Sequence, residues 1–404
     1  MRKVVITGLG TVNALGLDRI DTLKNIMAGK NGIKEITKFH TKEVYSKFAG
    51  EIDVKISDQI SSKELRRFDM ATIYGLFATR EAILDSDIRD NIEPNKLGVA
   101  IGNGFGGITT LMDSTNKKIG PFFITSILSN MISSAIATEI GAKGSTYTIN
   151  TACASSTDAI GKAFLQIRNG EMDYMLAGGT EASINENIFK GFEAIQALSK
   201  SKDINNSSQP FDKDRTGFVM GEGAGILMLE EKEQAVKRGA KIYGEIVGYS
   251  STNDSFNMVL PNPEGTEAVT AIMDAINMSG ISTDDIGYIN AHGTGTKAND
   301  ATETKIVKRA FGADVKKLRI SSNKGAVGHT LGASGAIETI ISLLSLSNNL
   351  IPGNVGLKNK DPECDLNYIK NNIETDNIRY MMKESFGFGG HNAVLCIKLG
   401  EENE

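Results

Sequence analysis

The stretch TINTACASSTDAIGKAF, residues 148–164, shows how this chain folds. Its β-branched, apolar start is typical of a buried strand, and residues 155–168 have the length and spacing of an amphipathic helix. Small residues join the two, so Cys153 stands where the strand turns into the helix. A strand that leads directly into a helix is the repeating unit of an α/β fold.

The same alternation extends along the whole chain. Helix-length segments lie at 155–168, 265–279 and 300–311. Strand-like apolar runs lie at residues 4–9, 97–102, 145–150, 174–179, 224–230, 243–249, 286–291, 318–323 and 392–399. We therefore predict an α/β fold whose mainly parallel strands are buried by helices. The apolar stretch 336–347 contains Glu338 and several serines, and we predict a buried helix there.

The strand-like runs form two sets that resemble each other. VVITGLG (4–10) and EIVGYSS (245–251) open the sets. VMGEGAGILMLEE (219–231) and GFGGHNAVLCIKLG (387–400) close them, each with a Gly-rich turn before an apolar strand. We place the seam near residue 240 and predict an N-terminal half, 1–240, and a C-terminal half, 241–404.

Composition narrows the classes of function. The chain has 404 residues, of which 40% are hydrophobic and 23% charged, as in a globular protein with a large core. Its net charge of −5 gives no overall basic field for nucleic acid. Three widely spaced cysteines argue against a disulfide framework or a zinc site, and a reducing cytoplasm fits best. The start of the chain lacks the long apolar region of a signal peptide.

Cys153 is the first candidate for chemistry. A thiol at a helix start feels the positive end of the helix dipole, so we expect a lowered pKa that favours the thiolate. Many free cysteines are simply small buried apolar residues, and the position of Cys153 alone leaves that alternative open.

Histidines supply the next candidates. His292 in AHGTGT and His329 in NKGAVGH each follow an apolar strand in a Gly-rich turn, where open α/β sheets bind ligands. A thiol beside two imidazoles suits chemistry in which sulfur holds an acyl thioester and the imidazoles donate to a developing negative oxygen. Lys324 can supply fixed positive charge with Glu338 as its partner, although a purely structural ion pair is an equal alternative.

Gly-rich loops at 102–107 and 387–392 let backbone N–H groups approach a reacting oxygen. The first loop also contains G-x-G-x-x-G after a strand, as dinucleotide sites do. Such a site needs an acidic residue about 20 positions later, and residues 116–138 contain none. We therefore reject a nucleotide-binding module.

Together these motifs resemble a known family. Cys153 in TACASS, His292 in AHGTGT, Lys324 and His329 in NKGAVGH and the late GFGG occur in the order found in β-ketoacyl-acyl-carrier-protein synthases of the thiolase superfamily. The resemblance spans essentially the whole chain and is closest to the type II elongating synthases. It implies a thiolase-like five-layered α-β-α-β-α fold of two similar halves, without metal or cofactor. It also implies a homodimer, with a heterodimer as the alternative.

The resemblance further implies a decarboxylating Claisen condensation. Cys153 takes the acyl chain from an acyl carrier protein. His292 and His329, with Lys324 and Glu338 beside them, stabilise the enolate formed as malonyl-acyl carrier protein loses CO₂. The backbone N–H groups of Cys153 and Phe388 form the oxyanion hole, and Phe388 gates the passage between the malonyl and acyl compartments.

Two further sites follow from the resemblance and the spacing. The acyl pocket of relatives matches five bulky apolar residues, which predict a dry, comparatively short tunnel for short, medium or rigid unsaturated chains: Phe105, Ile124, Ile188, Phe192 and Leu331. The alternative is that these side chains swing aside on loading, so that long saturated chains still fit. A carrier-protein docking patch is expected on one basic helix face, with two lysines nearby, although a solvated surface is the alternative. Its residues are Lys63, Arg66, Arg67, Lys117 and Lys118.

Other members of the class remain as alternatives. Asn323 and His391 stand where the family usually has threonine, which leaves the acyl substrate open and allows a polyketide or polyene pathway. A specialised ketosynthase with a Cys-less partner subunit is the main rival. A non-catalytic chain-length subunit would lack Cys153. A coenzyme A-dependent thiolase would carry a second catalytic cysteine in the last Gly-rich loop, where this chain has His391.

Overall fold

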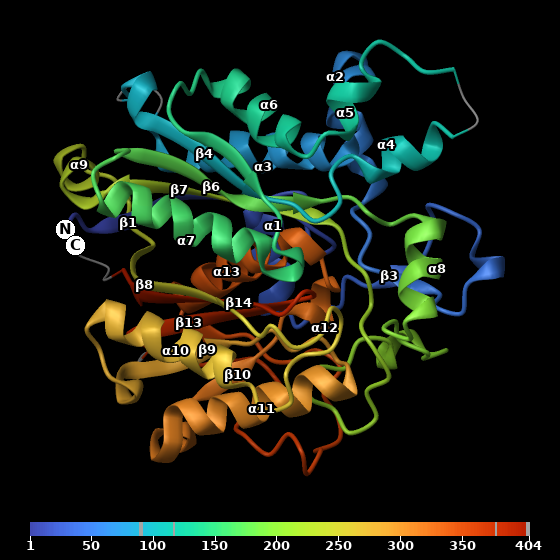
Figure 1. Ribbon diagram of the computed structural model, residues 1–404, viewed down its shortest axis with the longest axis vertical. Helices are drawn as coiled ribbons and strands as arrows, with labels where there is room; N and C mark the ends of the chain where they lie inside the picture. The colour runs from blue at the N-terminus through green and yellow to red at the C-terminus, as the bar shows by residue number, and fades with distance from the viewer. Residues whose placement is uncertain (89–91, 116–117, 376–377, 401–404) are drawn as a thin grey trace.

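The structure is a computed structural model that describes residues 1–88, 92–115, 118–375 and 378–400. A ten-stranded sheet runs through this part of the chain (Figure 1). Its N-terminal strands lie side by side in the order β5-β4-β6-β7-β1. In chain order they are β1 (Val4–Val12), β4 (Leu97–Gly102), β5 (Thr146–Ile149), β6 (Tyr174–Glu181) and β7 (Gly223–Glu231).

The C-terminal strands repeat this arrangement in the order β10-β9-β13-β14-β8. In each half the third strand in chain order, β5 or β10, lies at the outer edge, and the first strand, β1 or β8, lies at the seam. There β1 and β8 pair antiparallel, with Val4 opposite Ile246. This repeat is the structural counterpart of the two similar sequence sets; the division near residue 240 stays a prediction. The strands are β8 (Gly244–Asn253), β9 (Ile286–Asn290), β10 (Arg319–Ser321), β13 (Tyr380–Gly387) and β14 (His391–Leu399).

Strand direction differs from the sequence prediction. Parallel pairing occurs where β4 lies between β5 and β6, and where β9 lies between β10 and β13. The pairs β1–β7, β6–β7, β13–β14, β8–β14 and β1–β8 are antiparallel. The expectation of mainly parallel strands was wrong, because the last strand of each half, β7 or β14, runs antiparallel to both of its neighbours.

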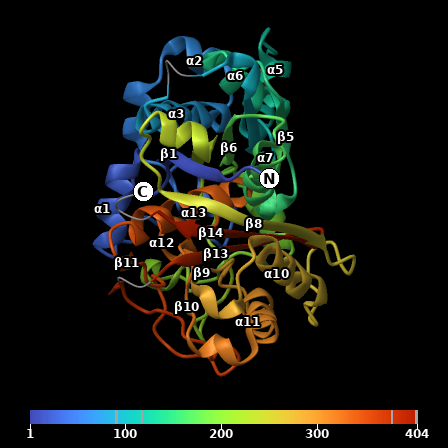
Figure 2. The same cartoon turned by 90° about the vertical axis from the view of Figure 1, so that its left-hand side faces the viewer.

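Helices complete five layers (Figure 2). Two helices lie between the halves of the sheet, α7 (Ser155–Arg168) and α13 (Ser334–Leu346). The outer face of the first half is covered by α3 (Met70–Ser86) and α6 (Asn130–Ile140), and that of the second half by α10 (Thr266–Ser279) and α11 (Lys297–Phe311). The predicted thiolase-like fold is confirmed.

Helix α13 of the central layer lies inside the molecule. Every residue of α13 is buried, because this helix packs against both halves of the sheet, and this confirms the buried helix expected at 336–347. The three cysteines are free and buried. None of the helices in the described ranges is long and apolar enough to cross a membrane.

Candidate active site

Cys153 lies in a tight turn between β5 and α7, in the 3₁₀ segment η4 (Ala152–Ala154). Ala152 has φ = 50°, a left-handed conformation that a non-glycine residue adopts only where its surroundings enforce it. The Asn150 side chain accepts a hydrogen bond from the Ala152 N–H at 3.1 Å. The Ser155 hydroxyl accepts from the Thr151 N–H at 2.9 Å and donates to the Ala152 carbonyl at 2.6 Å. These bonds hold the thiol at the start of α7.

Burial decides the acidity of this thiol. It raises the pKa of Cys153 to about 12, against the opposing effects of the Lys324 charge and of the Phe388 N–H, which donates to the sulfur. The sequence-based expectation of a lowered pKa is therefore corrected: the thiol of the free protein is neutral near pH 7. The Phe388 N–H thus lies next to the atom to which an acyl group would be attached.

A cavity of about 310 Å³ opens over Cys153. It brings together segments from both halves of the chain, and its lining is mostly apolar with two imidazoles among the aromatic side chains. The predicted site residues that line it are Cys153, Phe192, His292, His329, Leu331 and Phe388.

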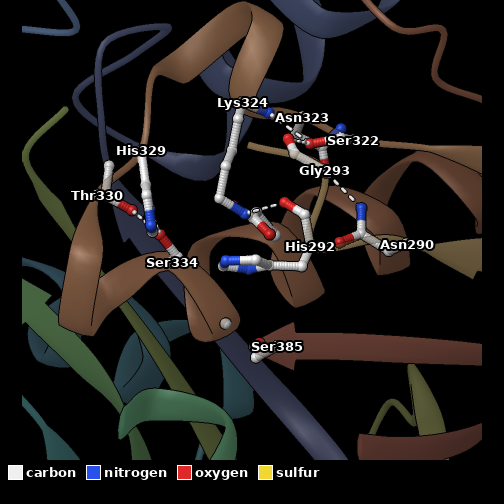
Figure 3. A network of polar contacts seen from close by, with 12 residues as sticks. Asn290, His292, Gly293, Ser322, Asn323, Lys324, His329, Thr330, Ser334 and Ser385 are labelled. Atoms are coloured by element: carbon white, nitrogen blue, oxygen red, sulfur yellow. Dashed lines mark hydrogen bonds and ion pairs between the residues drawn. The ribbon is translucent and has the colours of Figure 1, made fainter. Parts of the chain in front are cut away.

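His329 is fixed in one tautomer by its neighbours. The Ser334 hydroxyl lies 2.9 Å from its Nδ1 (Figure 3). The Leu331 N–H donates to the same atom at 3.3 Å. A neutral imidazole whose Nδ1 accepts carries its proton on Nε2. His329 therefore presents an Nε2–H donor, and its ring centroid lies 5.3 Å from that of His292.

His292 follows β9 on a loop that α11 holds in place. Glu303 accepts hydrogen bonds from the backbone N–H groups of His292 at 2.6 Å and Gly293 at 2.8 Å. Nδ1 of His292 is buried and has no hydrogen-bond partner among the described residues, so it is available to a substrate. Sequence reasoning missed these contacts of Glu303, since only the folded loop brings its carboxylate to the two N–H groups.

Both imidazoles are neutral at physiological pH. Burial lowers the pKa of His292 and of His329 well below 6.5, and the positive charge of Lys324 lowers both further. Neutral imidazoles remain hydrogen-bond donors through one N–H, which suits them to an oxygen that gains negative charge.

The predicted ion pair between Lys324 and Glu338 is present and buried. Lys324 Nζ lies 2.7 Å from Glu338 Oε1. The same ammonium group donates to the His292 carbonyl at 2.6 Å (Figure 3). Sequence reasoning missed Lys383, whose ammonium binds the other oxygen of the same carboxylate. A lysine inside an apolar strand was the available signal, but β13 was not among the predicted strands.

Four of the five predicted acyl-pocket residues lie close together. Ile188, Phe192 and Leu331 pack in one apolar cluster with Cys153, and the ring of Phe105 lies 6.3 Å from that of Phe192. Ile124 lies on α5 (Phe123–Ile127), outside this cluster. Ile124 is 59% exposed and Phe105 39%, so the wall on this side is open in a single chain.

The predicted docking patch lies on a short helix, α2 (Ser62–Arg67). Lys63, Arg66 and Arg67 are exposed, and Arg67 lies over the Phe122 ring, 5.6 Å from its centroid. Lys118 follows α4 (Ile108–Asp113) and is exposed, whereas Lys117 lies outside the described residues.

Comparison with known proteins identifies the family. The model of the β-ketoacyl synthase N-terminal domain matches residues 1–235, and that of the C-terminal domain matches residues 243–358. The chain belongs to the β-ketoacyl synthase family. This synthase is therefore a condensing enzyme and an acyltransferase, as its sequence motifs predict.

Individual relatives cover almost the whole synthase. It is 42% identical over 410 residues to a 3-oxoacyl-[acyl-carrier-protein] synthase 2 of Staphylococcus aureus, covering 99% of each chain. It is 41% identical over 407 residues to the protein of the same name from Synechocystis sp., covering 98% of each.

Solved structures agree with this assignment. A type II polyketide ketosynthase, in complex with its acyl carrier protein and bound to a hexaketide, has a TM-score of 0.91 at 30% identity, with 99% of this chain and 100% of that one covered. A β-ketoacyl synthase from Burkholderia phymatum has a TM-score of 0.90 at 29% identity, with the same coverage.

Proposed function

We propose that this synthase condenses an acyl group held on Cys153 with malonyl-acyl carrier protein and releases 3-oxoacyl-acyl carrier protein and CO₂. The observation that carries the proposal is the cavity in which a thiol and two neutral imidazoles meet. The names of the relatives from Staphylococcus aureus and Synechocystis sp. support the carrier protein as partner, as does the carrier-bound polyketide ketosynthase.

The first half-reaction loads the enzyme. The Cys153 sulfur attacks the carbonyl carbon of an acyl-carrier thioester, the carrier thiol leaves with a proton, and a thioester forms on the enzyme. The negative oxygen of the tetrahedral intermediate accepts hydrogen bonds from the backbone N–H groups of Cys153 and Phe388. The Phe388 contact with sulfur supports this assignment. Phe388 lies beside Phe192, at a centroid distance of 6.2 Å, where its ring would gate the acyl compartment.

The second half-reaction forms the carbon–carbon bond. The malonyl thioester oxygen accepts hydrogen bonds from His292 and His329 while the C–CO₂ bond breaks and an enolate forms. The enolate carbon attacks the Cys153 thioester, and the sulfur leaves as thiolate. Lys324, held by Glu338, keeps positive charge beside both rings.

Product analysis tests this reaction. Purified protein given an acyl-acyl carrier protein and malonyl-acyl carrier protein should form a 3-oxoacyl product two carbons longer, with one CO₂ released per product. Transfer between coenzyme A esters without CO₂ release would instead indicate a thiolase.

Charge reversal on α2 tests carrier-protein docking. We expect Arg66→Glu with Arg67→Glu to raise KM for the carrier-linked substrate and to make the rate less sensitive to salt, because an acidic carrier is steered by basic residues. A small thioester analogue should react as before. The matched control reverses two exposed lysines, Lys305→Glu on α11 with Lys316→Glu in the segment after it, and should leave KM unchanged. Helix α11 lies at the opposite end of the molecule from α2 (Figure 1). Equal effects on the carrier-linked and small substrates would contradict docking at α2.

A ladder of saturated acyl carriers tests the chain-length preference. Ile188, Phe192 and Leu331 pack around Cys153, and a packed wall resists extra methylenes at about 1–3 kcal/mol when overfilled. The unmodified protein should therefore prefer short, medium or rigid unsaturated chains. Phe105→Ala and Ile188→Gly should each extend the accepted length, since both side chains adjoin the cluster around Cys153. Efficient use of the longest saturated chains by the unmodified protein would rule out a short pocket.

We further propose a homodimer, a cytoplasmic location and a role in fatty-acid or polyketide chain elongation. Exposed apolar side chains beside the outer edge of the sheet support association with a second copy, because large exposed apolar patches mark interfaces. The exposed fraction of these residues is between 39% and 59%; they are Phe105, Leu111, Ile119, Phe122, Ile124 and Leu128. β5 is an edge strand next to them, and a partner chain would cover both.

A further inference from the structure

Lys383 is a fully buried lysine next to the residues of the proposed active site. It lies on β13, opposite Asn290 of β9. Asn290 precedes His292 by two residues. The Ser385 hydroxyl, on the same face of β13, lies 2.7 Å from that of Thr157 on α7. This face therefore points into the central helical layer, where Glu338 lies on α13.

Two ammonium groups share the Glu338 carboxylate in a matched arrangement. Lys383 Nζ binds Glu338 Oε2 and donates to the Ala291 carbonyl at 3.4 Å. Lys324 Nζ binds Glu338 Oε1 and donates to the His292 carbonyl at 2.6 Å. Consecutive carbonyls of the loop that carries His292 are thus tied through two lysines to one carboxylate.

A purely structural ion pair would not need the second lysine. Burying a charge costs free energy unless it is paired, and Lys324 alone would balance Glu338. With both lysines protonated, the trio Lys324–Glu338–Lys383 carries a net charge of +1 in a fully buried position. The Lys383 charge also lowers the pKa of His292 and His329, after the larger effects of burial and Lys324.

We propose that Lys383 is a positioning residue for malonyl decarboxylation: together with Lys324 it clamps the His292 loop onto Glu338 and keeps an extra positive charge beside the histidine pair. This inference rests on the proposed function. The clamp fixes the direction of the His292 ring, and the extra charge stabilises the negative oxygen of the enolate. Acylation of Cys153 uses backbone donors instead and should depend less on Lys383.

Deprotonation of Lys383 predicts a specific pH dependence of decarboxylation. Burial lowers the pKa of Lys383 to about 8, although Glu338 opposes this shift. As pH rises through about 8, Lys383 loses its proton and the net charge of the trio falls from +1 to 0. Decarboxylation should therefore decline on the alkaline side with a midpoint near 8. The titratable groups that act on Lys383 or adjoin it come from every neighbouring element: Glu338, Lys324, Glu303, Tyr288, His292, His329 and Glu384.

The test compares Lys383→Met, Lys383→Gln and Lys383→Arg with the unmodified protein. The first two should lower CO₂ release from malonyl-acyl carrier protein about tenfold at pH 7, less than the loss of a direct donor, and should remove the alkaline decline. Lys383→Arg keeps the charge, since arginine stays protonated, and should move the decline to higher pH. Acyl-adduct formation on Cys153 should change little in all three. Met and Gln leave Glu338 paired with Lys324, so no charge is left unpaired.

A lysine that pairs with a buried carboxylate away from the cavity supplies the control. Lys38 pairs with Glu222 outside the cavity, and Lys38→Met should lower Tm while the alkaline decline stays near pH 8. The inference is overturned if the Met and Gln variants keep the decarboxylation rate and pH profile of the unmodified protein. It is also overturned if both half-reactions fall together with Tm while the alkaline decline persists. If the unmodified protein is acylated but releases no CO₂, the proposed function itself fails, and the inference with it.

Discussion

Replacing Cys153 with serine should reduce condensation by several orders of magnitude. The nucleophile must lose a proton to accept the acyl group, and a hydroxyl gives up its proton far less readily than a thiol. Burial raises the pKa of the Cys153 thiol to about 12, and it would also raise the pKa of a serine hydroxyl at the same place, so the hydroxyl stays the far weaker acid. The measurement is the rate of 3-oxoacyl formation, together with the mass of the acyl-enzyme.

The Cys153→Ser variant should separate the two half-reactions. CO₂ release from malonyl-acyl carrier protein should persist, because His292 and His329 do not depend on sulfur to donate to the malonyl oxygen. Cys364 is also free and buried, and Cys364→Ala is the matched control that should retain acylation. Unchanged condensation in Cys153→Ser would show that another residue carries the acyl group.

Replacing either His292 or His329 with alanine should reduce malonyl decarboxylation by about 10²–10³, the usual loss for one oxyanion donor. Acylation of Cys153 should survive better, since its proposed oxyanion donors are backbone groups. His40 is exposed, and His40→Ala is the matched control that should leave both half-reactions unchanged. Normal decarboxylation in both His292→Ala and His329→Ala would contradict the assigned roles.

The pH dependence of the histidine pair has a definite sign. Their pKa values are lowered well below 6.5, so both rings stay neutral as pH falls through the range in which an exposed histidine gains a proton. Decarboxylation should therefore show no acid decline near pH 6.5 and should fall only at lower pH. A midpoint near the ordinary histidine pKa would mean that the rings are solvated during turnover.

The sequence predicts those parts of the fold that depend on local pattern. Apolar runs marked most strands, and the stretch at 148–164 placed Cys153 at the start of a helix, as the structure has it. β13 was not predicted because Lys383 and Glu384 interrupt its apolar pattern. Both side chains are buried in the folded protein, where they interact with residues far away in the sequence. Strand direction was misjudged because a hairpin such as β13–β14 is set by how the chain returns.

The active site also has features that the sequence predicts and features that it does not. Cys153, His292 and His329 line one cavity with Lys324 and Glu338 paired beside it, and motif spacing was enough to predict this set. The acidity of the thiol was not predictable, since it depends on burial that only the folded cavity produces. The contacts of Glu303 and Lys383 with the His292 loop join segments far apart in the sequence, so no local pattern reports them.

Trapping the acyl-enzyme tests the central claim most directly. The protein is incubated with a mixture of acyl-acyl carrier proteins, digested and mapped by mass spectrometry, with and without a chase of malonyl-acyl carrier protein. We predict a single acyl adduct on Cys153 that disappears during the chase as a 3-oxoacyl product two carbons longer is formed. An adduct confined to Cys364 or Cys396, or an adduct on Cys153 that malonyl-acyl carrier protein does not discharge, would contradict the account.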